Sequence, residues 1–160
     1  MTAVLVFAGT AVPSSAAGFA AGFSFGYTGE RTESFNGSVT AGLNFKSETI
    51  PLCFYGDAAF DLSETGSEVF KYAEISVDYF IASPVVSDSF LHFFYGAEFA
   101  VGIYDNYFAD AGFCSGLSWL AGYDTELFFK ASFRAGITFA ESSPSFNIMI
   151  PVKCGVKFYF

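Results

Sequence analysis

The sequence has few of the residues that build metal sites and disulfide frameworks. Its 160 residues include one histidine, His92, and three cysteines, Cys53, Cys114 and Cys154. An odd number of cysteines does not suit a disulfide framework, and the spacings match no zinc-binding pattern, which requires clustered cysteine and histidine ligands. We therefore expect no disulfide bond, no metal site and no cofactor.

Positive charge is also scarce, because 7 Lys and Arg residues stand against 16 Asp and Glu residues and give a net charge of −9. A nucleic-acid-binding surface needs clustered cations to neutralise phosphates. Beyond the N-terminus, the sequence also lacks an apolar run of about 18 residues, the length that a membrane-spanning helix requires. These absences argue against a nucleic-acid partner and against a helical membrane protein.

Large apolar side chains, by contrast, are in excess. The chain is 52% hydrophobic and 21% aromatic, with 23 Phe, which is too apolar for a disordered protein. Each large aromatic residue buries about 150–250 Å², and the interior of a small eight-strand barrel only just holds its own side chains. We therefore expect the phenylalanines to face outward into lipid.

The final segment, residues 146–160, shows the pattern most clearly. Every even position is apolar, from Phe146 to Phe160, whereas Asn147, Lys153 and Lys157 lie on the odd positions. A period of two predicts a strand with two different faces, and an apolar outer face with a polar inner face is typical of a membrane barrel. Pro151 is a cost in this strand because it removes one backbone donor.

The same alternation predicts further strands near residues 19–27, 35–45, 52–62, 69–79, 91–104, 117–124 and 129–139. We therefore predict an all-β fold, a closed antiparallel up-and-down transmembrane β-barrel of about eight strands, whose closure leaves no strand edge in lipid. The pattern places Phe70 and Cys53 on the inner face and Cys154 on the lipid face. Residues 105–115, which include Cys114, are predicted to form the longest loop.

The N-terminal segment has the features of a secretory signal peptide. Residues 3–12 form a short apolar run, and Ser15-Ala16-Ala17 is a small-x-small cleavage pattern. We predict a signal peptide over residues 1–17 and a barrel domain over residues 18–160. Met1-Thr2 lacks the usual Lys or Arg, as expected if the natural start lies upstream of Met1. The alternative is an apolar first strand that the mature protein retains.

The polar faces of the predicted strands carry opposite charges on opposite walls. Near half height, the inward residues are Asp57, Glu74 and Glu98 on one side and Arg134 and Lys153 on the other. Charges in a narrow, low-dielectric interior are costly unless paired, so we predict a salt-bridge network across the lumen. Two interpretations remain open: a structural plug, or a gate whose partners exchange and open a narrow water path. That path would run beside the small residues Gly22, Ser24, Gly26, Thr40 and Gly42.

The C-terminus, in which Cys154, Val156, Phe158 and Phe160 alternate and the last residue is aromatic, resembles the C-terminal signature of bacterial outer-membrane barrels. With the strand count and polar lumen, it makes the chain similar to the small eight-stranded proteins of the OmpA-barrel, OmpX and OmpW type. The resemblance implies a location in the outer membrane of a Gram-negative or spirochaete-type diderm bacterium. It also implies contact with outer-membrane lipid, and with the barrel-assembly machinery, which reads this signature during insertion.

We therefore expect an integral outer-membrane barrel with a narrow, charge-bridged lumen. It would act either as a minor porin-like channel that transports small, including hydrophobic, solutes or as a structural envelope protein. The alternative is a surface adhesin that binds host factors through its extracellular loops. A soluble lipocalin-like carrier would require the two faces to be reversed, with the phenylalanines inside.

Enzymatic activity is not expected. By resemblance, lipid-modifying barrels place a histidine with a serine and a carboxylate near the outer leaflet. His92 is instead predicted inside the lumen near the periplasmic end of its strand. A nucleophile and base pair is therefore not indicated, and we expect His92 to be a hydrogen-bonding residue of the lumen.

Overall fold

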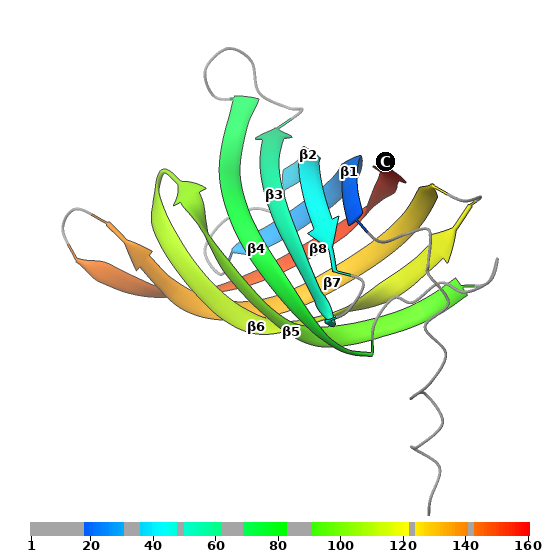
Figure 1. The fold of residues 1–160 in the computed structure, drawn as a ribbon. Helices are drawn as coiled ribbons and strands as arrows, with labels where there is room; N and C mark the ends of the chain where they lie inside the picture. The colour runs from blue at the N-terminus through cyan, green and yellow to red at the C-terminus, as the bar shows by residue number, and fades with distance from the viewer. Residues whose placement is uncertain are drawn as a thin grey trace, which may run out of the picture.

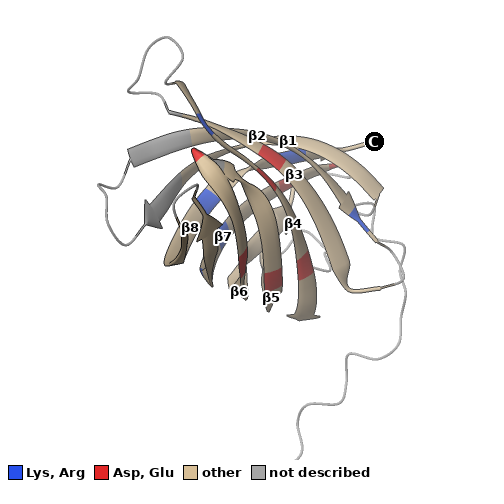
Figure 2. Cartoon of the chain, turned by 90° about the vertical axis from the view of Figure 1, so that its left-hand side faces the viewer, with Lys and Arg blue, Asp and Glu red and all other residues tan. Residues whose placement is uncertain are grey.

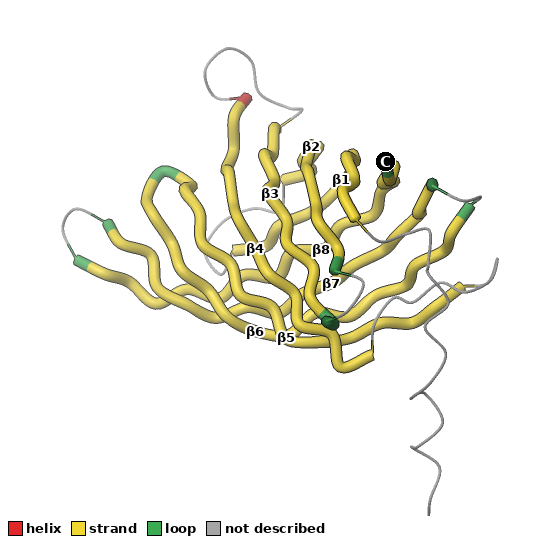
Figure 3. Tube along the Cα trace, viewed as in Figure 1, coloured by secondary structure: helices red, strands yellow, loops and turns green. Residues whose placement is uncertain are grey.

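The computed structural model describes residues 18–30, 36–47, 50–61, 69–82, 91–121, 124–140 and 143–160, so the predicted signal peptide lies outside the described residues. Nearly all of the described residues are in strands (Figures 1 and 3). The strands are β1 (Gly18–Glu30), β2 (Asn36–Lys46), β3 (Leu52–Asp61), β4 (Phe70–Ala82), β5 (Leu91–Tyr104), β6 (Asn106–Leu120), β7 (Thr125–Phe139) and β8 (Pro144–Tyr159).

The strands form a closed antiparallel barrel. Each strand pairs with the next along the chain, and β8 returns to pair with β1, from Ala20 opposite Tyr159 to Glu30 opposite Met149. Figure 1 shows the end of β8 beside β1. Closure gives the backbone groups of the two terminal strands their partners, as a barrel wall in lipid requires. This confirms the predicted eight-stranded up-and-down fold.

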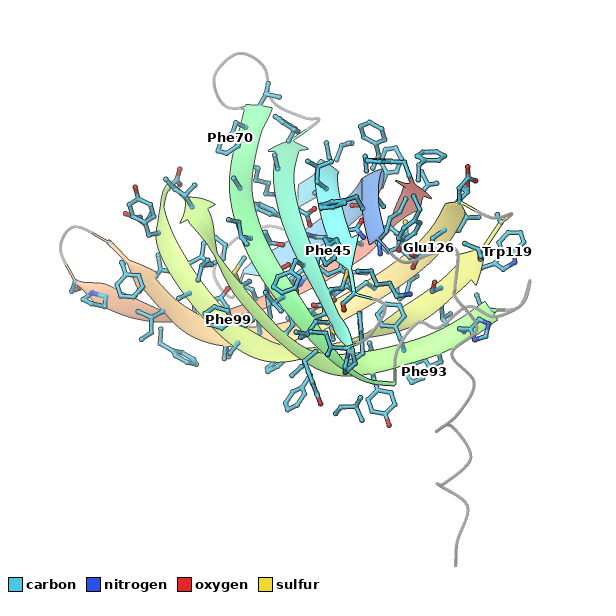
Figure 4. All side chains as sticks on the ribbon, viewed as in Figure 1. Phe45, Phe70, Phe93, Phe99, Trp119 and Glu126 are labelled. Carbon is cyan, nitrogen blue, oxygen red and sulfur yellow. The ribbon has the colours of Figure 1, made fainter. Side chains whose placement is uncertain are left out.

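The two faces of the wall differ as the alternation predicts. Phe93 and Phe99 on β5 point away from the barrel (Figure 4), and their side chains are 60% and 52% exposed. Glu98, on the same strand, points inward and is only 5% exposed. An outer wall with so much exposed apolar surface is suited to lipid rather than to water. The outer face also carries Phe19, Phe23, Phe25, Leu43, Phe54, Ile75, Phe113, Phe129, Phe133, Ile137, Phe146 and Phe158. No helix among the described residues has the length and apolar character needed to cross a membrane.

The predicted long loop over residues 105–115 is wrong. β5 and β6 join at Asp105, which has a φ of +38°, and β6 begins at Asn106. Asp is one of the few residues other than Gly that adopts this left-handed conformation readily. The alternation was hidden because β6 places Ala109 and Ala111 outward and Phe108 inward, so its two faces differ little in hydropathy.

This correction changes the position of Cys114, which is buried on the inner face of β6 rather than in a loop. Cys53 is buried on the inner face of β3, and Cys154 is exposed on the outer face of β8, both as predicted. The three cysteines are free thiols.

Phe70 is the second correction, because it faces outward rather than inward. The register between β3 and β4 shifts at Ala59 and Phe60, so that Phe70 pairs with Phe60 and Lys71 is the extra residue of a β-bulge. A bulge reverses the facing of residues on one side of it. Phe70 is accordingly 50% exposed and makes an edge-on contact with Phe60, at 6.2 Å between ring centroids.

Replacing Phe99 by Arg should test the orientation of the wall, because Phe99 lies near the middle of β5 on the outer face. We expect Phe99→Arg to lower the free energy of unfolding by about 2–4 kcal/mol, the usual cost of a cation at the lipid face near the bilayer midplane. Urea unfolding in lipid vesicles would measure it. Phe99→Leu keeps the face apolar and should cost much less. Equal stability of Phe99→Arg and wild type would show that this face does not contact lipid.

Candidate functional site

The barrel interior holds most of the charged groups that the structure describes within the strands. The acidic side chains come mainly from β3 to β6, and the cations come mainly from β7 and β8 (Figure 2). The strand order places these two groups of strands on different walls of the closed barrel. The interior is therefore an electrostatic contact between an acidic wall and a basic wall.

Seven of these side chains form one continuous series of ion pairs, which we call the charge chain. Carboxylates and cations alternate along it in the order Asp78, Lys130, Glu98, Arg134, Glu74, Lys153 and Asp57.

Lys130 is the first cation of the charge chain and bridges β4 and β5. Its Nζ donates to both carboxylate oxygens of Asp78, at 2.9 Å to Oδ1 and 2.7 Å to Oδ2, and to Glu98 Oε1 at 3.2 Å. Its ammonium also lies 4.8 Å from the centroid of the Tyr55 ring, close enough for a cation–π contact. All three ammonium donors of Lys130 thus have carboxylate partners.

Arg134 and Lys153 continue the series across the lumen. Arg134 Nη2 donates to Glu74 Oε2 at 2.9 Å, and Nη1 donates to Glu98 Oε1 at 3.4 Å. Lys153 Nζ donates to Glu74 Oε1 at 3.0 Å and to Asp57 Oδ2 at 3.1 Å. Each cation therefore joins two carboxylates, and Glu74 and Glu98 each join two cations.

The strand register explains why these groups meet. Asp78, Glu98, Gly112 and Arg134 lie in one cross-strand row over β4 to β7. A Cβ atom at Gly112 would lie 2.7 Å from the Cα of Arg134. It would also lie 1.9 Å from the backbone oxygen of Phe133, so the close approach of β6 and β7 at this row requires glycine.

The structure brings all five residues of the predicted network, Asp57, Glu74, Glu98, Arg134 and Lys153, into the charge chain. It adds Lys130 and Asp78, which the sequence placed on the inner face but not at the height of the other charges. The alternation gives the facing of a residue but not its height, because the stagger between strands sets which inner residues meet.

A second polar cluster lies at the end of the barrel where β1 begins and β8 ends, and Glu126 is at its centre (Figure 4). Glu126 accepts a hydrogen bond from the Ser118 hydroxyl, at 2.7 Å, and another from the Tyr159 hydroxyl. Lys157 Nζ lies 3.6 Å from Glu126 Oε1. The cluster ties β6 and β7 to the closing strand β8.

The residues of the predicted assembly signal lie on the other face of β8. Phe158 and Phe160 are 47% and 82% exposed, Cys154 is exposed and Val156 is half-buried. They therefore form an outward stripe on the strand that closes the barrel, and Tyr159 between them points inward to Glu126. Recognition of this stripe by the assembly machinery stays a prediction.

Two cavities border the interior charges. One has a volume of about 40 Å³ and lies between the charge chain and Lys157. The other, of about 520 Å³, is an open depression in the wall along β1, β2 and β3, because its lining includes the outward Phe23 and Leu43 as well as the inward Gly22, Gly42 and Glu74. It includes Gly22 and Gly42, two of the small residues that the sequence analysis expected to leave space.

Metal-type ligands also meet inside the barrel, where one ligand atom each of Asp78, Glu98 and Cys114 lies within 4.8 Å of the others. Lys130 Nζ is hydrogen-bonded to both of these carboxylates, and Arg134 also pairs with Glu98, so two cations already compensate their charges. These residues therefore fit the charge chain better than a metal centre. His92 is half-buried near the start of β5, opposite Ser118 in the register, with its Nε2 atom buried.

These features define a class of protein, the small transmembrane β-barrels with eight antiparallel strands, an apolar outer wall and a polar interior. Two solved structures share the fold. The crystal structure of neisserial surface protein A aligns with 89% of this chain and 96% of its own, with a TM-score of 0.53 and 15% identity. A transmembrane β-barrel designed de novo aligns with 88% and 92%, with a TM-score of 0.52 and 14% identity.

No protein-family model matches the chain, and no curated protein sequence matches it significantly. At 14–15% identity, the two structural matches establish the fold and not the activity. They confirm the predicted resemblance to small eight-stranded outer-membrane barrels.

Removing Arg134 should destabilise the barrel, because Arg134 and Glu74 are each only 1% exposed in their side chains. Arg134→Ala would leave two buried carboxylates short of a cation, and we expect a loss of about 3–5 kcal/mol in the free energy of unfolding. Urea unfolding in vesicles would measure it.

A double variant serves as the matched control for this prediction. Adding Glu74→Gln to Arg134→Ala removes one of the stranded charges, so it should restore part of the lost stability. If the loss of stability in the double variant instead equalled the sum of the losses in Arg134→Ala and Glu74→Gln alone, Arg134 and Glu74 would not be coupled in the membrane.

Proposed function

We propose that this chain is an integral outer-membrane protein whose lumen is closed in this state and which serves the envelope as a structural barrel. The observation that carries the proposal is the charge chain, which crosses the lumen and joins β3, β4 and β5 to β7 and β8. The cavity of about 40 Å³ beside the charge chain is large enough for only about three water molecules. A solute could not pass this level without rearrangement of the ion pairs.

A minor channel for small solutes is the second candidate, and the sharing of partners favours it. Glu98 Oε1 accepts from both Lys130 and Arg134, at 3.2 and 3.4 Å. A cation that loses one carboxylate therefore keeps another, which lowers the cost of exchanging partners compared with breaking an isolated buried pair. A path lined by these charges would suit small polar solutes better than hydrophobic ones.

The described part of the structure offers little support to the adhesin alternative. Residues 105–115, the longest loop that the sequence predicts, do not provide a binding loop, because all of them but Asp105 belong to β6. The contacts that we propose for the chain are outer-membrane lipid around its wall and the barrel-assembly machinery at Phe158 and Phe160, both of which are exposed on the outer face of β8.

The proposed location can be tested by fractionation. The protein should co-purify with outer membranes, need detergent for extraction and run faster on a gel before heating than after, because a closed barrel resists unfolding by detergent at room temperature. Recovery in the soluble fraction without detergent, at the same expression level, would contradict an integral membrane location.

The state of the lumen can be tested by planar-bilayer conductance. The wild type should show little or no steady conductance because the charge chain fills the lumen. Arg134→Ala, which disconnects Glu74 from Glu98, should raise the frequency of openings severalfold if the barrel can act as a channel.

The matched control is Lys71→Ala, because Lys71 lies at the bulge beside the first residue of β4 and takes no part in the charge chain. It should behave as wild type. A large steady conductance of the wild type would contradict the closed lumen, and the absence of openings in Arg134→Ala would leave the structural barrel as the function.

A further inference from the structure

Pro151 interrupts the hydrogen bonding between β7 and β8. The two strands keep one register on both sides of this residue, but the rows at Ser132 and Phe133 of β7 are missing from the pairing. On its other side Pro151 is paired normally, opposite Thr28 of β1. The nitrogen of Pro151, which carries no hydrogen, therefore faces Ser132 across the β7–β8 gap.

The missing donor leaves one backbone acceptor of the wall without its ladder partner, the carbonyl oxygen of Ser132. Buried backbone carbonyls are almost always hydrogen-bonded, and ordered water serves where the sheet supplies no donor. The outer face at this point carries the exposed side chains of Phe133 and Ile150, and lipid chains have no donor to offer. A donor for Ser132 can therefore come only from the inside of the barrel.

The cavity of about 40 Å³ lies on that inner side, because Pro151 and Ser132 both line it. Two further groups of its wall also lack a hydrogen-bond partner within the described part of the structure. One is an acceptor, the buried Oε2 atom of Glu98. The other is a donor, Lys157 Nζ, since Glu126 Oε1 lies 3.6 Å away, beyond the usual hydrogen-bond range. The cavity thus presents acceptors and a donor together.

The charges around the cavity need no counter-ion. Each lysine that borders it has a carboxylate beside it, in the pairs Lys130–Asp78, Lys153–Asp57 and Lys157–Glu126. The rest of the polar wall includes the hydroxyl groups of Ser24, Ser76 and Ser132, which both donate and accept. A small neutral molecule that also does both fits this wall, and water is the one that the volume admits.

We infer that this cavity is a water site built into the wall, in which a bound water molecule donates to the Ser132 carbonyl oxygen in place of the backbone donor that Pro151 lacks. A volume of about 40 Å³ holds about three water molecules, and the others join Lys157 Nζ to Glu98 Oε2. The site completes the hydrogen bonding of the wall where lipid cannot, and it does not depend on whether the barrel conducts.

A crystal structure of the full barrel, at a resolution that shows ordered water, tests the site directly. We expect a water molecule in the cavity at about 2.7–3.2 Å from the Ser132 carbonyl oxygen. A cavity without ordered water would overturn the inference, and so would a Ser132 carbonyl oxygen that is bonded to a protein donor instead.

A double-mutant cycle between Ser76→Val and Pro151→Ala tests the role of the water in solution. Ser76→Val places two methyl groups at the cavity wall and should exclude the water that serves Ser132, which should lower the melting temperature by about 3 °C or more. In the Pro151→Ala background the new backbone N–H bonds Ser132 directly, so the same change should lower the melting temperature by about half as much or less.

The matched control is Ala59→Val, because Ala59 is buried on β3 but does not line the cavity. Its effect on the melting temperature should be the same with Pro151 and with Pro151→Ala. An effect of Ser76→Val that is also the same in both backgrounds would contradict the inference. Should a variant fail to fold, the wild-type crystal structure still decides the question.

Discussion

The structure depends on one constraint, which is that no polar group can be left unsatisfied in a hydrocarbon surrounding. The backbone meets it by closing β8 onto β1, so that no strand edge remains. The ionised side chains meet it by turning inward, where the charge chain gives each carboxylate at least one cation. The same constraint thus determines the hydrogen bonding of the wall and the chemistry of the interior.

The interior resembles a packed core built from ion pairs. Aromatic rings are part of it, since Tyr55 lies beside both Lys130 and Lys157 and thereby connects the charge chain to the Glu126 cluster. Because Glu126 also accepts from Ser118 and Tyr159, the network reaches the closing strand. A continuous series of contacts therefore joins the charged groups of the lumen to the pairing of β8 with β1.

The sequence predicted the features that follow from the period of a strand. The eight strands, the inward positions of Glu74 and Arg134, and the outward stripe ending at Phe160 all follow from a period of two. What it could not predict depends on register. The bulge at Lys71 reverses Phe70, and the stagger of strands brings Lys130 to Asp78. The first part of β6, over residues 106–115, was not predicted as a strand, because the outward Ala109 and the inward Phe108 weaken the contrast between its two faces. The left-handed turn at Asp105 has no signal apart from its residue type.

Register also explains why a barrel of this kind would keep charges in its interior, where apolar residues of similar size often give equal or greater stability. A slip of two residues between β7 and its neighbours would leave every outward phenylalanine on the lipid face, because facing depends only on parity. The aromatic outer wall therefore cannot distinguish the native register from such a slip. The charge chain can, since the slip would part Arg134 from Glu74 and Lys130 from Asp78, which now lie 2.9 and 2.7 Å apart. Stranded buried charges would cost several kcal/mol each, so the interior specifies the pairing that the exterior leaves ambiguous.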